Sequence, residues 1–145
     1  MDVNTGTGSP ESLSPSDERT WAMLAHLTVL ANLVTGFLGT VAALVIYLVY
    51  KERSRYVAYH SMQAFIFQLV WWIGGGALTG IAWTFTGISS IALIGLLCIP
   101  LACLVSLVPL GSIVYGIIGA IQCSQGQDFR YWLVGDWVRG TLTGE

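Results

Sequence analysis

Apolar residues fall into three long blocks along the chain, separated by short polar stretches. The blocks cover residues 21–50, 56–84 and 88–123 approximately. A helix needs about 20 apolar residues to cross the hydrocarbon core of a bilayer. Each block is long enough to do so, and the pattern therefore predicts an all-α integral membrane protein.

The first block is too long for one straight crossing. A helix over residues 21–50 would be about 45 Å long at 1.5 Å per residue, whereas the hydrocarbon core is about 30 Å thick. Its middle reads NLVTGFLG, a sequence rich in turn-forming residues. We therefore predict two short helices, 18–34 and 38–51, that form a hairpin turning near Gly36 and Gly39. A single tilted helix is the alternative.

The second block predicts one crossing that ends at an uncharged loop, residues 84–90. The third block contains Pro100 and Pro109, and a proline removes a helical hydrogen bond and kinks the helix. It predicts one long, kinked last helix whose first part, 88–99, is a separable short segment. The result is a membrane domain of four hydrophobic helices over residues 17–126.

Both ends of the chain differ from this domain. Residues 1–16 are rich in Gly, Ser, Thr and Pro, which predicts a disordered tail. Ser16, followed by two acidic residues, predicts the N-cap of the first helix. Residues 127–145 predict an interfacial segment along the membrane surface, because they mix aromatic and basic side chains. The predicted anchors are Trp132, Trp137, Arg130 and Arg139.

Composition and charge agree with a membrane protein. Charged residues make up 10% of the chain and hydrophobic residues 54%, whereas a soluble domain has roughly 25% charged residues. The net charge of −2 does not favour a nucleic-acid partner. Lys51, Arg53 and Arg55 lie between the first two blocks, and the positive-inside rule places them in the cytoplasm together with both termini.

The polar residues inside the blocks are candidates for contacts between helices. On a helix, His60 shares a face with small residues and is flanked by Gln63 and Gln68, so this face points toward protein. We predict that these glutamines and Asn32 hydrogen-bond neighbouring helices or loop carbonyls. The alternative is a cofactor site. With a hairpin, His26 and His60 lie at similar depth; the two together could ligate a haem iron, or one of them a chlorophyll magnesium.

Small residues predict close helix packing, within the chain or against a partner. Gly76 and Gly80 form a GxxxG pattern, and Ser112, Gly116 and Ala120 form a stripe of small residues.

The sequence does not predict an enzyme. It contains no HExxH and no phosphate-binding glycine loop. Cys98, Cys103 and Cys123 are interpreted as small apolar side chains packed among helices. No metal site and no cofactor are therefore expected, with haem or chlorophyll as the less favoured alternative.

Three stretches together resemble a known family: DERTWAMLAHLTVL (17–30), IYLVYKERSRYVAYHSMQAFIFQ (46–68) and AIQCSQGQDFRYWL (120–133). The middle motif is carried by Lys51, Tyr56, Val57, His60, Ala64 and Gln68. The family consists of small bacterial membrane proteins without an assigned function, related to the membrane subunit of the chloroplast inner-envelope protein-import translocon (Tic). The resemblance implies a four-helix fold in a bacterial inner membrane, with both ends on the same side.

Two functions follow as hypotheses. The first is a non-catalytic accessory subunit that packs against a larger membrane complex, since the spans contain few ionisable residues. The second, implied by the resemblance, is a component of protein translocation. The expected partners are the lipid bilayer and other membrane protein subunits.

Overall fold

The computed structural model describes residues 12–143, which fold into helices with no strand among them. The prediction of an all-α protein is thus confirmed. Residues 1–11, most of the predicted disordered tail, lie outside the described residues. The helices are α1 (Pro15–Leu27), α2 (Val29–Thr35), α3 (Leu38–Tyr50), α4 (Arg55–Leu69), the π-helix η1 (Val70–Gly74), α5 (Gly75–Ser90), α6 (Gly95–Ser106), α7 (Val108–Ser124) and α8 (Gly135–Thr143).

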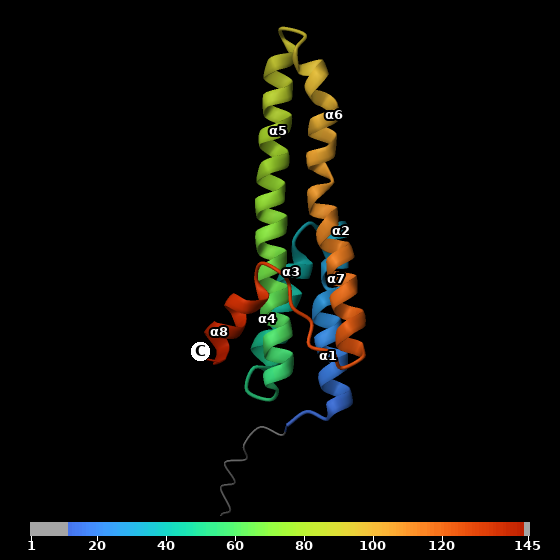
Figure 1. Ribbon diagram of the computed structural model, residues 1–145, viewed down its shortest axis with the longest axis vertical. Helices are drawn as coiled ribbons and strands as arrows, with labels where there is room; N and C mark the ends of the chain where they lie inside the picture. Colours follow the sequence, from blue (N-terminus) through green and yellow to red (C-terminus); the bar gives the residue numbers. More distant parts are fainter. Residues whose placement is uncertain (1–11, 144–145) are drawn as a thin grey trace, which may run out of the picture.

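Two long antiparallel helices dominate the molecule (Figure 1). One is the continuous helix Arg55–Ser90, formed by α4, η1 and α5, and the other is Gly95–Ser124, formed by α6 and α7. By length and composition alone, both could cross a membrane. The other apolar helix, α3, has only 13 residues. The predicted four crossings are therefore not confirmed; two long candidate spans are.

Helices α1, α2 and α3 form a shorter bundle beside one end of this long hairpin. They pack on α4 and α7 and leave α5 and α6 uncovered (Figure 1). The predicted turn near Gly36 is present, with Gly36 in the left-handed region at φ 76°. The predicted helix 18–34 is divided into α1 and α2, because the helix is interrupted at Thr28. The Thr28 hydroxyl donates to the Ala25 carbonyl.

The start of α1 differs from the prediction. Its N-cap is Ser14, whose side chain accepts a hydrogen bond from the Asp17 backbone N–H at 3.2 Å. Pro15 occupies the first turn, where its missing N–H costs nothing. Ser16 is therefore already inside the helix.

The predicted loop at residues 84–90 is wrong, because α5 continues through it. The hydroxyls of Thr86 and Ser90 donate to carbonyls four residues earlier, Ala82 and Thr86. This bonding keeps polar side chains inside a helix. The turn lies after Ser90 instead and contains Leu93 at a φ of 61°.

The last long helix breaks at a different place from the one predicted. Pro100 lies inside α6, and α7 begins at Val108 with Pro109 in its first turn. The predicted separable segment 88–99 is divided between α5, the turn and α6.

The C-terminal segment is only partly on the surface. Phe129 and Tyr131 are buried in the core, so the part of the chain predicted as an interfacial segment, residues 127–145, begins with a buried loop that is followed by α8. The main core combines this loop and α8 with α1, α4 and α7. Its buried members are Ala22, Tyr59, Phe67, Cys123, Phe129, Tyr131, Val134 and Val138.

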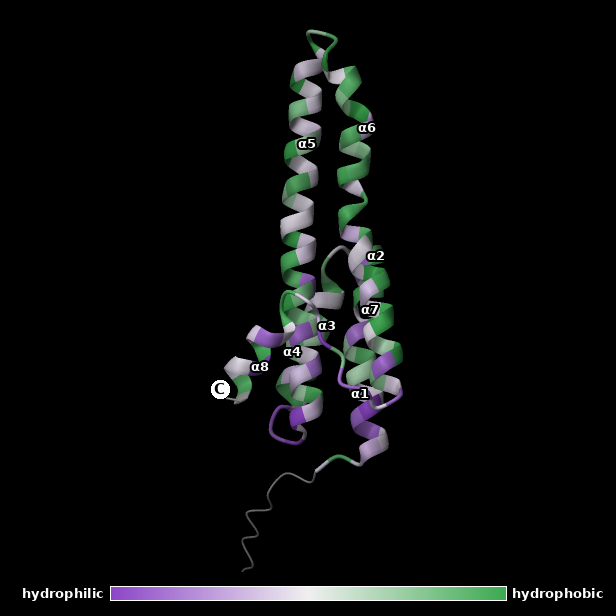
Figure 2. Cartoon of the chain, viewed as in Figure 1, coloured by the Kyte–Doolittle hydropathy of each residue, from purple (hydrophilic) through white to green (hydrophobic). Residues whose placement is uncertain are grey.

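Polarity is distributed unevenly along the molecule. The α5–α6 end is apolar, whereas hydrophilic residues gather at the opposite end (Figure 2). Residues 56–127 include no Asp, Glu, Lys or Arg. Large apolar side chains at the α5–α6 end are exposed, for example Ile91 at 88% and Leu97 at 82%. This surface needs lipid or protein around it.

Candidate functional site

The core beside the charged end contains an unusual number of polar side chains. His26, His60, Gln63, Gln68 and Asn32 are each 0–1% exposed. They form two groups. We call the first the histidine cluster (His26, His60, Gln63, Cys123 and Tyr131) and the second the amide network (Thr28, Asn32, Thr40 and Gln68).

Glycines on α7 leave space for the histidine cluster and let α7 approach α1 and α2 closely. A Cβ on Gly119 would lie 2.7 Å from Cε1 of Phe129 and 3.1 Å from Nδ1 of His26. A Cβ on Gly116 would lie 2.8 Å from Cγ1 of Val29. The stripe of Ser112, Gly116 and Ala120 is buried, and at Gly116 it meets Val29 directly. Here the small residues set the distance between helices.

The other predicted packing residues are placed differently. A Cβ on Gly76 or on Gly80 would meet nothing within 4 Å. Within the described residues, this GxxxG face of α5 is therefore open and packs against no other helix.

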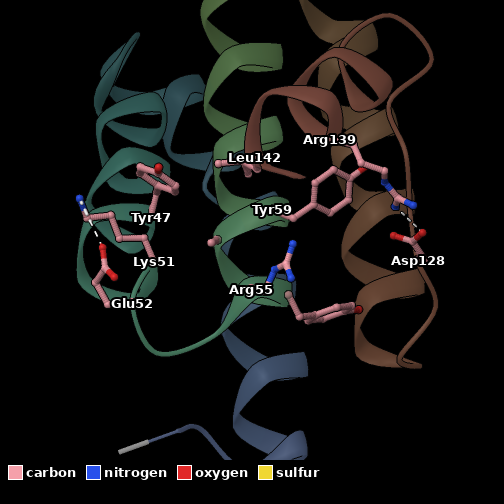
Figure 3. A pocket seen from close by; sticks show the side chains of 10 residues that line it. Tyr47, Lys51, Glu52, Arg55, Tyr59, Asp128, Arg139 and Leu142 are labelled. Atoms are coloured by element: carbon pink, nitrogen blue, oxygen red, sulfur yellow. Dashed lines mark hydrogen bonds and ion pairs between the residues drawn. The ribbon is translucent and has the colours of Figure 1, made fainter. Parts of the chain in front are cut away.

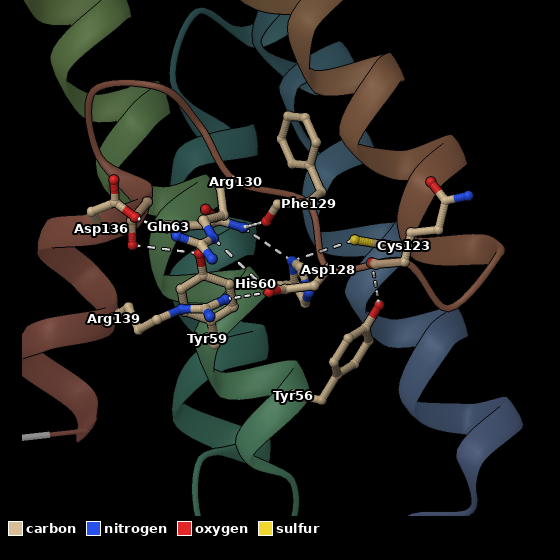
Figure 4. Close-up of polar contacts among 12 residues, drawn as sticks. Tyr56, Tyr59, His60, Gln63, Cys123, Asp128, Phe129, Arg130, Asp136 and Arg139 are labelled. Atoms are coloured by element: carbon tan, nitrogen blue, oxygen red, sulfur yellow. Dashed lines mark hydrogen bonds and ion pairs between the residues drawn. The ribbon is translucent and has the colours of Figure 1, made fainter.

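The two histidines lie against each other. Nε2 of His26 is 3.3 Å from Nδ1 of His60, although the residues are on α1 and α4. The same Nδ1 is 3.0 Å from Nε2 of Gln63 and 3.4 Å from Sγ of Cys123. Figure 4 shows Gln63 and Cys123 meeting His60 from two sides. Three possible donors thus surround one ring nitrogen.

Gln63 joins the cluster to the buried loop. Its Nε2 donates to the Phe129 carbonyl at 2.8 Å, and its Oε1 accepts from the Tyr131 backbone N–H at 3.3 Å. A buried loop must have its backbone groups paired. This amide therefore holds the loop against α4 and positions Tyr131.

Tyr131 completes the cluster from the other side of His26. Its hydroxyl lies 2.9 Å from Nδ1 of His26. Burial raises the pKa of the Tyr131 phenol well above its usual range, and nearby Cys123 and Tyr115 raise it further. The phenol therefore stays protonated and can donate to His26 or accept from it.

Cys123 is the member that the sequence did not reveal. It was interpreted as a packing residue, yet it is buried with its sulfur beside His60. His26, His60 and Cys123 together offer three ligand atoms that all lie within 4.8 Å of one another. His60 and Cys123 are 63 residues apart, so no local spacing could have indicated the group.

The amide network joins α1, α2, α3 and α4. Nδ2 of Asn32 donates to Oε1 of Gln68 at 3.0 Å and contacts Oγ1 of Thr40 at 3.2 Å. Gln68 in turn donates to Oγ1 of Thr28 at 2.9 Å. The predicted interhelical partners of Asn32 and Gln68 are thus each other and two threonines, and the network holds the α2–α3 turn to α4.

A cavity of about 600 Å³ opens at the charged end, between α3, α4 and the C-terminal segment (Figure 3). Charged groups of both signs reach it, including the Lys51–Glu52 pair at 3.9 Å. Its lining is Tyr47, Lys51, Glu52, Arg55, Tyr56, Ala58, Tyr59, Asp128, Arg139 and Leu142. The rings of Tyr56 and Tyr59 also pack on the His60 ring, with centroids 4.4 and 5.0 Å away. His60 therefore lies one side-chain layer behind the cavity.

The predicted anchors Arg130 and Arg139 are at this end, whereas Trp132 lines a groove with Trp71 and Gly111, farther along the molecule. Arg130 pairs with Asp136 at 2.8 Å, and Arg139 pairs with Asp128 and lies 4.8 Å from the Tyr59 ring centroid. The hydrogen bond that Arg139 donates to the Asp128 carboxylate raises the pKa of Arg139 above its usual value. Trp132 and Trp137 are 83% and 62% exposed, in agreement with contact outside the chain.

The geometry limits which cofactor the histidines could share. Two axial nitrogens on one haem iron lie about 4 Å apart, twice a metal–nitrogen bond of about 2 Å, with a macrocycle between them. His26 and His60 approach to 3.3 Å and contact each other directly. These residues therefore do not fit a haem between them.

Comparison with known proteins identifies the chain. The family model described as the magnetosome magnetite crystal formation protein family, MamF/MmsF, matches residues 17–138. No curated protein and no solved structure matches. The match corrects the resemblance to a Tic-related family, and nothing in it supports protein translocation. With two long apolar helices, it points to a membrane location. The chain belongs to the MamF/MmsF family of magnetosome magnetite crystal formation proteins.

Proposed function

We propose that this protein is a non-catalytic membrane subunit that supports magnetite crystal formation by packing against other proteins of the same membrane. Its charged end, with the C-terminal segment, faces the cytoplasm according to the positive-inside rule. The apolar α5–α6 end is the surface that its partners cover.

One observation carries the proposal: the apolar hairpin is too long for a bilayer. The helix Arg55–Ser90 has 36 residues, and at 1.5 Å per residue it is about 54 Å long. Enclosing that length in roughly 30 Å of hydrocarbon needs a tilt of about 55°, beyond the range of about 0–40° for membrane helices.

On this helix the exposed large apolar side chains begin at Val70 and continue toward Ile91 in the turn after it, and on α3, which packs beside α4, exposed apolar side chains reach Leu48. Part of this surface therefore lies outside the hydrocarbon unless protein covers it. A partner in the same membrane removes that cost. A non-catalytic role agrees with the burial of the histidine cluster, whose histidine and cysteine side chains are all 0% exposed.

The test combines cell phenotype with assembly state. Host cells lacking the chain should form smaller or fewer magnetite crystals by electron microscopy, and the wild-type chain should restore them. A variant with serine in place of the exposed Leu97 and Leu101 should reach the membrane but fail to restore crystals. It should also lose the constant-composition complex that the wild type forms on native gels in mild detergent.

A matched control substitutes the charged end, Glu52→Gln, and should restore normal crystals. The proposal fails if the wild-type chain purifies alone from native membranes, or if the serine variant restores crystals fully.

A further inference from the structure

We propose that His26, His60 and Cys123 form a buried site for one thiophilic metal ion, and that the charge of the site selects Cu(I). The inference does not depend on the role proposed above in crystal formation. It rests on the histidine cluster and on the cavity beside it.

The distances fit a metal centre. Bonds of about 2.0–2.1 Å to nitrogen and about 2.3 Å to sulfur place ligand atoms roughly 3.3–3.8 Å apart in tetrahedral or trigonal geometry. Nε2 of His26 and Nδ1 of His60 are 3.3 Å apart, and Nδ1 of His60 and Sγ of Cys123 are 3.4 Å apart. The ligand atoms of all three residues lie within 4.8 Å of one another. Bringing the most distant pair to the separation of two ligands on one metal ion therefore needs a shift of at most about 1 Å.

Hydrogen bonding alone leaves the cluster unbalanced. Nδ1 of His60 faces His26, Gln63 and Cys123, more donors than one lone pair can serve. Nε2 of the same ring is buried and has no hydrogen-bond partner among the described residues. A cation held by Nδ1 of His60, Nε2 of His26 and the Cys123 sulfur would use the crowded lone pair of Nδ1, and Nε2 of His60 would then carry the ring proton.

The surroundings prepare the ligands for a metal. The residues come from three packed helices, α1, α4 and α7, and all three are 0% exposed. Tyr131 contacts Nδ1 of His26 at 2.9 Å, so a proton on Nδ1 leaves Nε2 free to ligate. A partner on the second ring nitrogen is what metal-bound histidines almost always have.

The donor set and the burial select the ion. Thiolate and imidazole suit Cu(I) and Zn(II), whereas Mg²⁺, Ca²⁺ and Mn²⁺ prefer oxygen ligands, and non-haem Fe(II) sites pair two histidines with a carboxylate. The Cys123 thiol loses its proton to solvent when the metal–sulfur bond forms, with no change in oxidation state. One thiolate then neutralises Cu(I), but leaves one positive charge on Zn(II), which is costly in a buried site.

An entry path exists at the charged end. The rings of Tyr56 and Tyr59 separate His60 from the cavity of about 600 Å³. The carboxylates of Glu52 and Asp128 line the same cavity and would attract a cation. Rotation of one tyrosine ring would open the way to His60.

The experiment titrates Cu(I) anaerobically into the full chain in detergent, against a chromophoric Cu(I) chelator. The starting protein carries Cys98→Ser and Cys103→Ser, so that Cys123 is its remaining thiol. We expect one Cu(I) per chain and an X-ray absorption spectrum with two nitrogen ligands and one sulfur ligand. Adding Cys123→Ser or His60→Asn should weaken binding more than about 100-fold, the upper range for losing an outer partner, and Tyr131→Phe should weaken it about tenfold.

A second measurement needs no change in the cluster. Equimolar Cu(I) should slow alkylation of Cys123 in the same starting protein at least tenfold. Equal alkylation rates with and without Cu(I) would overturn the site, as would Cu(I) binding that survives Cys123→Ser and His60→Asn in variants that keep the wild-type circular dichroism. Tighter binding of Zn(II) or Fe(II) than of Cu(I) would overturn the assignment of a monovalent ion.

Discussion

Tyr131 is the largest of the fully buried side chains, and its hydroxyl is the partner of Nδ1 of His26. We expect Tyr131→Phe to lower the free energy of unfolding by about 1–3 kcal/mol, because it leaves a buried ring nitrogen unpaired while keeping the shape of the side chain. Reversible unfolding of the purified chain in detergent measures this. Tyr47→Phe, at a half-buried position on α3, is the control. Equal losses in the two variants would contradict the role of the hydroxyl.

Some of this polar core could be predicted at the level of residues. Helical periodicity placed His60, Gln63 and Gln68 on or beside a face of small residues, and the structure buries all three. The partners could not be predicted. Cys123 and Tyr131 reach the cluster from α7 and from a loop, and their contacts depend on how distant helices pack. A pattern with a period of 3.6 residues contains no information of that kind.

At the level of elements, the space around each glycine shows whether that face of its helix packs against the rest of the chain or is open. A Cβ on Gly39 would lie 1.9 Å from the Thr28 carbonyl oxygen, whereas one on Gly80 would meet nothing within 4 Å. We expect Gly39→Ala to destabilise the purified chain by more than about 2 kcal/mol, because a backbone carbonyl must move. Gly80→Ala should be neutral or up to about 1 kcal/mol stabilising, since alanine favours a helix.

Thermal unfolding of both variants, followed by circular dichroism in one detergent, gives the comparison. A Gly39→Ala chain as stable as the wild type would show that α2 and α3 do not pack as described. A destabilised Gly80→Ala chain would instead mean that the α5 face is occupied even in the purified protein.

The turns between elements were predicted unequally well. The turn near Gly36 was predicted from the turn-forming residues of NLVTGFLG, and in the structure Gly36 adopts the positive φ that glycine allows. The loop expected at residues 84–90 was wrong, because its threonines and serines bond to the helix backbone and do not end the helix. The actual turn includes Leu93, a residue that gives no turn signal in the sequence.

For the whole molecule, the separation of charge from apolar surface predicts a topology. The loop between α3 and α4 and the start of α8 both lie at the charged end, opposite the α5–α6 tip (Figure 1). Charged groups do not cross a bilayer readily, so both segments should face the same aqueous compartment. The positions of Lys and Arg in the sequence predict the same orientation, with both segments on one side of the membrane. They do not predict how many helices cross the membrane.

Single cysteines test this topology. With Cys98 and Cys103 replaced by serine, and Cys123 buried, we expect Glu52→Cys and Asp136→Cys to react with a membrane-impermeant maleimide added to the same side of sealed vesicles. Ile91→Cys, at the tip, should not react from that side. Detergent-permeabilised vesicles control for reagent access, since all three cysteines are at exposed positions and should then react. If Glu52→Cys and Asp136→Cys instead react from opposite sides, the two charged segments do not share a compartment. The packing of α8 beside α4 would then not exist in the membrane.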